Sequence, residues 1–98
     1  MNVFIYGFEG TYSGSSSIEF SSPEEGATHK AMLFLRQVSE SVDFDLALAG
    51  INEFGFTDIQ SLRGNQLKVE SMNDPKMAVF SKYYEEALET GSSLVWYP

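Results

Sequence analysis

Residues 74–98, DPKMAVFSKYYEEALETGSSLVWYP, contain the pattern that decides the fold. Asp74 followed by Pro75 is a typical helix start, because aspartate caps free amides and proline has no amide to leave unpaired. Apolar residues then recur at helical spacing, at Met77, Phe80, Tyr84, Ala87 and Leu88. Gly91 supplies the left-handed residue that ends many helices. The run 94–97 is apolar and β-prone, so this segment predicts one helix followed by one strand.

The first half of the chain contains another strand and two helix signals. Residues 3–8 (VFIYGF) are apolar on both faces, which is typical of a strand covered on both sides. Ser22 and Glu25 have the spacing of a capping box, and Pro23 fits the first helical position. The apolar stripe behind them predicts a helix over 22–38. A second helical segment is expected from the cap at Asp43.

Beyond that segment, the pattern becomes extended again. Gly55 ends the helical spacing, and 57–63 is predicted as a strand. Gly64-Asn65 is typical of a two-residue hairpin turn, which makes 66–71 a return strand, although a loop or a short helix also fits its imperfect alternation.

The predicted order is strand, helical pair, strand, strand, helix, strand, the βαββαβ arrangement called ferredoxin-like. We therefore predict one α+β domain over residues 1–98, a two-layer sandwich. Its four-stranded antiparallel sheet would carry the helices on one face, because right-handed crossovers place them there. The first helix would have two segments, and an extended Gly/Ser-rich loop (9–17) would precede it.

Composition limits the classes of function. The chain has 98 residues, 43% of them apolar, and no cysteine, which excludes a disulfide scaffold and a thiolate metal site. Its formal charge of −8 opposes binding to nucleic acid and to anionic membranes, and favours a basic protein partner or simply solubility. Without a targeting segment or a long apolar stretch, we expect a soluble, cytoplasmic protein.

Motifs for catalysis, cofactors or metals are weak. His29 is the single histidine, and no nucleophile elbow accompanies it. The glycines after the first strand fit neither known phosphate-binding spacing. Asp43 and Asp45 lack the further ligands and the glycine of a calcium loop. We therefore predict no catalytic, cofactor-binding or metal-binding residue.

Aromatic and acidic residues are the remaining candidates for a binding surface. A sheet covered on one face would leave rings exposed, so they would bind a partner or pair two copies in a homodimer, unless the loop 9–23 covers them. Glutamates gather late in the last helix, where the helix dipole disfavours them. The candidate partner-binding residues are Phe4, Tyr6, Phe8, Trp96, Tyr97, Glu85, Glu86 and Glu89.

The leading hypothesis is a non-catalytic protein–protein interaction module: an inhibitor, an immunity-type protein or a regulatory factor. One alternative is a small-molecule-binding regulatory domain, with a pocket between sheet and helices under the Gly/Ser-rich loop. The other is an enzyme that uses His29 with a nearby carboxylate.

Overall fold

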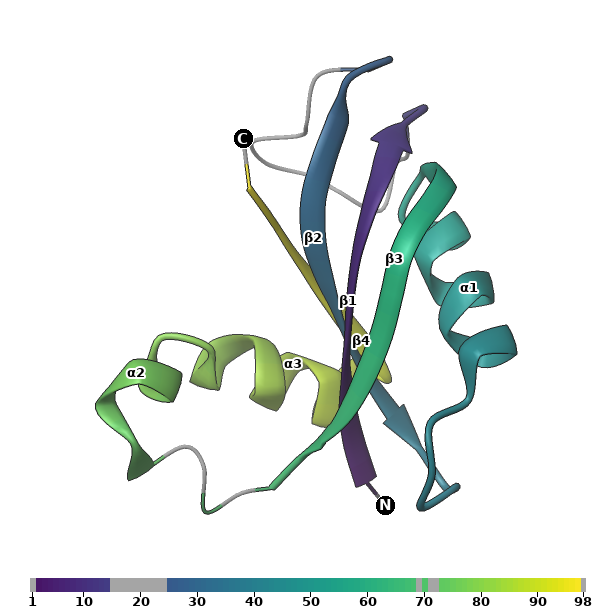
Figure 1. The fold of residues 1–98 in the computed structure, drawn as a ribbon. Helices are drawn as coiled ribbons and strands as arrows, with labels where there is room; N and C mark the ends of the chain where they lie inside the picture. The colour runs from purple at the N-terminus through teal and green to yellow at the C-terminus, as the bar shows by residue number, and fades with distance from the viewer. Residues whose placement is uncertain (1, 15–24, 69, 71–72, 98) are drawn as a thin grey trace.

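The computed structural model describes residues 2–14, 25–68, 70 and 73–97. The elements in chain order are β1 (Asn2–Tyr12), β2 (Thr28–Gln37), α1 (Phe44–Glu53), β3 (Phe56–Leu67), α2 (Pro75–Ala78), α3 (Ser81–Thr90) and β4 (Ser92–Tyr97). The strands form one antiparallel sheet in the order β3-β1-β2-β4 (Figure 1). An α+β fold with a four-stranded antiparallel sheet is therefore confirmed.

β1 is one of the two central strands, and α1 covers one of its faces. Phe4, Tyr6 and Phe8 point to this face and form one buried cluster with Ala47 and Ile51 of α1. Large buried rings give a small sheet much apolar area to hold a helix.

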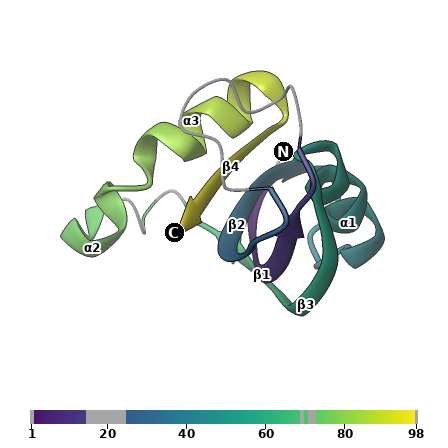
Figure 2. The same cartoon turned by 90° about the horizontal axis from the view of Figure 1, so that it is seen from above.

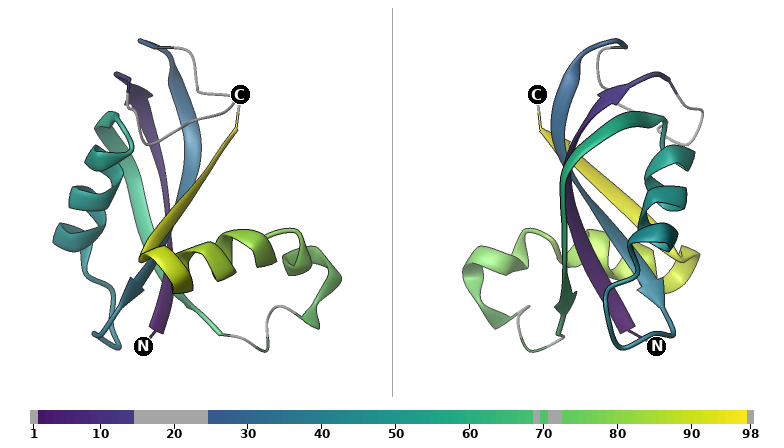
Figure 3. Two further views of the ribbon diagram at one scale, coloured as in Figure 1. Left: turned by 180° about the vertical axis from the view of Figure 1, so that it is seen from behind. Right: turned by 45° about the vertical axis from the view of Figure 1, so that its right-hand side comes forward.

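α3 covers the other face of the sheet. Val3 of β1 and Phe34 of β2 join Ala87 of α3 in a second buried cluster, and the rings of Phe34 and Tyr83 stack 5.8 Å apart. Figures 2 and 3 show α1 and α3 on opposite sides of the sheet. The prediction that both helices lie on one face is wrong, because the sheet is the middle of three layers.

The helix predicted over 22–38 is also wrong where the structure describes it, because β2 spans Thr28–Gln37. Ala31, Leu33 and Leu35 point toward α1, whereas Met32 and Phe34 point toward α3. A strand buried on both faces is a continuous apolar run, which also satisfies helical spacing. β1 and β2 therefore pair directly, and no helix connects them among the described residues. The predicted cap at residues 22 and 23 lies outside those residues.

The predicted hairpin at Gly64-Asn65 is wrong, because β3 continues through both residues. Gly64 lies opposite Tyr6, and a Cβ atom there would come within 2.7 Å of the Tyr6 ring. A glycine inside a strand commonly marks such a close approach. Gly64 is therefore a packing residue and not a turn residue.

The predicted helix ends are confirmed at three positions. Asp43 caps α1, with its Oδ1 accepting a hydrogen bond from Leu46 N at 3.1 Å. Gly55 follows this helix with φ 90°, and Gly91 ends α3 with φ 103°. Both glycines occupy the left-handed region that side chains disfavour.

The apolar stripes of the helical segments predict seven core residues from the sequence, and most of them are confirmed. The predicted set is Phe34, Leu35, Leu48, Ile51, Phe80, Tyr84 and Leu88. Phe34, Leu35 and Ile51 are buried, and three others are largely buried, namely Leu48, Phe80 and Tyr84. Leu88 is the exception: it is 37% exposed, and its neighbour Ala87 is fully buried. The contact face of α3 is thus rotated from the predicted one. No helix among the described residues is long and apolar enough to cross a membrane.

Candidate functional site

The first-strand rings do not form a surface. Phe4, Tyr6 and Phe8 are 2%, 0% and 1% exposed beneath α1. The expected open aromatic face is therefore wrong, because these rings pack in one buried cluster with residues of α1. The Tyr6 hydroxyl also donates to Gln37 Oε1 at 2.7 Å and accepts from Asp43 N at 2.9 Å. Tyr6 therefore ties β1 to the start of α1.

The two C-terminal rings lie nearer the surface, on opposite faces of β4. Trp96 is half-buried against the α1-side cluster, with its ring 5.3 Å from that of His29. Tyr97 is 41% exposed. Of the five predicted aromatic contact residues, the structure thus leaves these two for a partner.

The three glutamates of α3 are exposed, as a contact surface requires. Glu85, Glu86 and Glu89 lie on a helix that packs along β4, where Ser93 Oγ donates to Tyr83 O at 2.5 Å. The structure thus places these acids on the helix that contacts β4, whereas Trp96 packs on the opposite, α1-side face of the sheet.

A cation lies at the C-terminal end of α3, where the helix dipole favours positive charge and disfavours the glutamates. Arg36 of β2 donates from Nη1 to Leu88 O at 2.5 Å, which satisfies one of the free carbonyls at the helix C-terminus. This pairing could not be predicted from sequence, because it requires residue 36 to lie on a strand beneath the helix.

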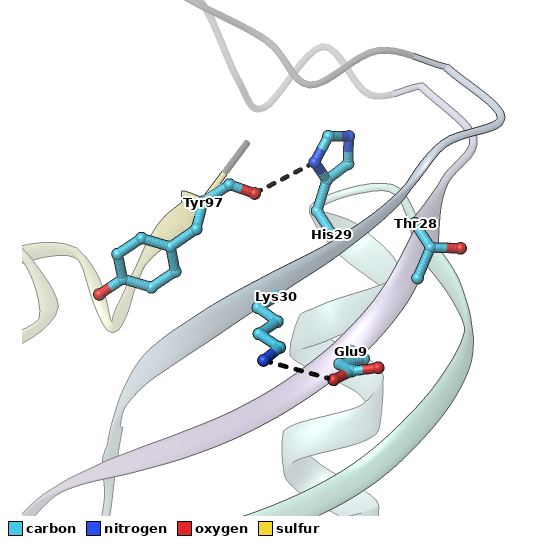
Figure 4. Close-up of a pocket in the computed structure, with 5 residues that line it drawn as sticks. All are labelled: Glu9, Thr28, His29, Lys30 and Tyr97. Atoms are coloured by element: carbon cyan, nitrogen blue, oxygen red, sulfur yellow. Dashed lines mark hydrogen bonds and ion pairs between the residues drawn. The ribbon is translucent and has the colours of Figure 1, made fainter.

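A pocket of about 380 Å³ lies at the end of the sheet where β1, β2 and β4 meet (Figure 4). Its lining residues are Glu9, Thr28, His29, Lys30 and Tyr97. Of these residues, the sequence pattern indicated a role only for His29 and Tyr97. Once residue 30 is placed on β2, its pairing with Glu9 follows from the strand register.

The charged side chains of this pocket are largely exposed to solvent. Lys30 Nζ and Glu9 Oε1 are 4.0 Å apart, and their side chains are 76% and 40% exposed. An exposed pair of this kind contributes little, about 0–1 kcal/mol.

His29 has a defined orientation. Its Nδ1 lies 3.1 Å from Tyr97 O, and since a carbonyl only accepts, Nδ1 carries the hydrogen. In the neutral ring Nε2 then has the lone pair, and among the described residues this buried atom has no hydrogen-bond partner.

No acid–base pair forms at His29 among the described residues. Figure 4 shows His29 and Lys30 leaving β2 in opposite directions, as alternation along a strand requires. Glu9 lies with Lys30. The carboxylate nearest in the sheet is therefore on the opposite face from the imidazole.

The described residues contain no group of three or more His, Cys, Asp or Glu side chains that could hold a metal ion. Comparison with protein-family models, curated proteins and solved structures finds no match.

Proposed function

We propose that the protein is a non-catalytic interaction module that binds a basic protein through α3 and β4. The observation that carries this proposal is the position of Glu85, Glu86 and Glu89 on the exposed side of a helix packed along β4. A net charge of −8 adds a long-range attraction for a cationic surface and accelerates encounter. Trp96 and Tyr97 belong to the residue types enriched at binding hot spots. A role as an inhibitor, an immunity-type protein or a regulatory factor fits this description, and cytoplasmic location stays a prediction.

The experiment is affinity capture from an extract of the source organism with two charge-reversed variants. The test variant carries Glu85→Lys, Glu86→Lys and Glu89→Lys. The control variant carries Glu40→Lys, Asp45→Lys and Glu70→Lys, three exposed acids outside α3. Both variants change the net charge equally, so a difference between them reports the local surface.

We expect the wild type and the control variant to capture the same basic protein, identified by mass spectrometry, and the α3 variant to lose it. Equal capture by all three proteins would contradict the proposal. Equal loss in both variants would contradict it as well, because it would show that only the net charge matters.

A second candidate function is binding of a small polar molecule in the pocket at His29. The pocket volume of about 380 Å³ falls in the range of ligand sites, roughly 300–1,000 Å³. All five lining residues carry a polar side-chain group and two of them are charged, whereas such sites are lined mainly by hydrophobic and aromatic side chains, which makes this the weaker candidate. Screening small polar metabolites by changes in Trp96 fluorescence tests it, with His29→Ala as the control.

A further inference from the structure

The two edges of the sheet differ in how well they are protected against pairing with another strand. The β3 edge is irregular: between Gly7 and Glu9 and again between Glu9 and Thr11, three residues of β3 span two of β1. Asp58 and Ser61 adopt positive φ values of 53° and 56° at these bulges. Bulges and charged side chains are the usual devices that block edge pairing.

The outer side of β4 has none of these devices. Its six residues pair with β2 from Ser92 to Tyr97 without a register shift. Residues 91–97 contain no charged side chain and no proline. A regular, uncharged edge strand is a ready template for another extended chain.

The hydrogen-bond pattern shows which backbone groups point away from β2. Arg36 N donates to Gly91 O at 2.9 Å, so Arg36 and Gly91 form a hydrogen-bonded pair between β2 and the start of β4. In an antiparallel ladder, hydrogen-bonded pairs alternate with pairs that are not hydrogen-bonded. The backbone groups of Ser93, Val95 and Tyr97 therefore face β2, and those of Ser92, Leu94 and Trp96 face outward.

Two other contacts agree with this alternation. Tyr97 O, on the β2 side, lies 3.1 Å from the His29 ring. Ser92 O, on the outward side, accepts a hydrogen bond from Thr90 Oγ1 at 2.9 Å. Among the described residues, the outward groups of Leu94 and Trp96 have no recorded hydrogen-bond partner. We call these groups the β4 edge.

We propose that the β4 edge binds an extended basic segment of the partner protein, which adds to the sheet as a fifth strand. This inference rests on the proposed function and specifies its binding mode. Strand addition supplies affinity through main-chain hydrogen bonds and specificity through alternate side chains. On the α3 side of the sheet, lysine or arginine side chains of the added strand would lie next to the helix that carries the glutamates. On the opposite face, apolar side chains would pack beside Leu94 and Trp96.

Charge argues against a second copy of this chain as the occupant. Antiparallel pairing of two β4 strands would place two α3 helices on the same face, each with Glu85, Glu86 and Glu89 exposed. The added strand would then offer no basic residue to either helix. Like charges brought together across an interface oppose binding.

The first test uses a short capped peptide of alternating valine and lysine as the probe. We expect it to slow hydrogen exchange at the Leu94 and Trp96 amides by about tenfold, with smaller changes at the Val95 amide, which is already bonded to β2. A peptide N-methylated at alternate amides keeps the side chains but cannot pair, so it should leave exchange unchanged. Equal protection by both peptides would overturn the proposal, and so would protection that grows with protein concentration without peptide, which would identify a second copy as the occupant.

The second test compares Leu94→Pro with Leu94→Ala. Proline removes an amide that points outward and leaves the bonds to β2 in place. Alanine keeps that amide but loses the side chain. We expect the proline variant to bind the probe at least about tenfold more weakly than the alanine variant, with the amide spectrum of β2 unchanged in both. Equal binding by the two variants would overturn strand addition.

The captured partner separates this inference from the proposed function. If the α3 charge reversal abolishes capture and Leu94→Pro does not, the interaction module stands and strand addition is contradicted. If the α3 charge reversal leaves capture intact, the proposed function itself fails.

Discussion

Tyr6 is the residue at which the strand, the turn and the helix meet. Its buried hydroxyl bonds to Gln37 and Asp43, so Tyr6→Phe leaves a buried amide side chain and a backbone N–H without that partner. We expect a loss of about 1–3 kcal/mol in the free energy of unfolding, measured by urea denaturation. Tyr97→Phe makes the same chemical change at an exposed position and should cost less than about 0.5 kcal/mol. Equal effects would show that the hydroxyl of Tyr6 is not anchored.

His29 is expected to be dispensable for partner binding. His29→Ala removes the ring contact with Trp96 and the bond to Tyr97 O, but it also removes a buried nitrogen that lacks a partner among the described residues. These effects oppose each other, so stability should change by less than about 1 kcal/mol. Binding of the captured partner should stay within about twofold of wild type, and loss of binding in a folded variant would place His29 in the functional site.

At the scale of elements, the helix face of α3 gives a direct test of packing. Leu88→Ala should cost no more than about 1 kcal/mol, because this side chain is partly exposed. Ile51→Ala, in the fully buried face of α1, should cost about 2–5 kcal/mol. Urea denaturation of the two variants measures the difference. If Leu88→Ala lowered the free energy of unfolding more than Ile51→Ala does, Leu88 would belong to the buried face of α3, as the sequence predicted.

The N-cap of α1 and the glycines that follow α1 and α3 could be predicted from sequence, because capping is local chemistry that involves residues within one turn. The single helix predicted from Asp74 is wrong, because the chain forms the short α2 first, and α3 begins at Ser81 after Phe80, which makes no side-chain cap bond.

β2 could not be predicted, because the run around Phe34 fits both a helical stripe and a strand buried on both faces. The assignment of Gly64 to a turn failed for a related reason: its small size is required by Tyr6, a contact distant in sequence. One clue was present, since the two apolar faces of β1 already indicated cover on both sides. Two helices on opposite faces meet that requirement.

The candidate site was predicted in part. The exposure of the acidic positions on α3 could be predicted, because helical spacing separates them from the apolar positions that face the core. Phe4, Tyr6 and Phe8 were misassigned because the sheet was expected to have an open face. The pocket around His29 was missed because it depends on the register between β1 and β2.

For the whole molecule, the covered faces change the expectation for self-association. The homodimer predicted from sequence relied on exposed Phe4 and Tyr6, and both are buried within one chain. We now expect a monomer at micromolar concentration, because each copy carries a net charge of −8 and no large aromatic face remains on β1. Sedimentation equilibrium measures this directly, with Trp96→Lys as the control. A wild-type dimer that the substitution dissociates would show that β4 pairs with its own copy.

The measurement that tests the central claim most directly is the dissociation constant of the captured basic partner, determined by calorimetric titration for three proteins. The wild type and the control variant (Glu40→Lys, Asp45→Lys, Glu70→Lys) should agree within about threefold. The variant with Glu85→Lys, Glu86→Lys and Glu89→Lys should bind at least about tenfold more weakly, because local charge pairs contribute beyond net attraction. Three equal dissociation constants, or equal weakening in both variants, would contradict the claim that α3 and β4 form the binding surface.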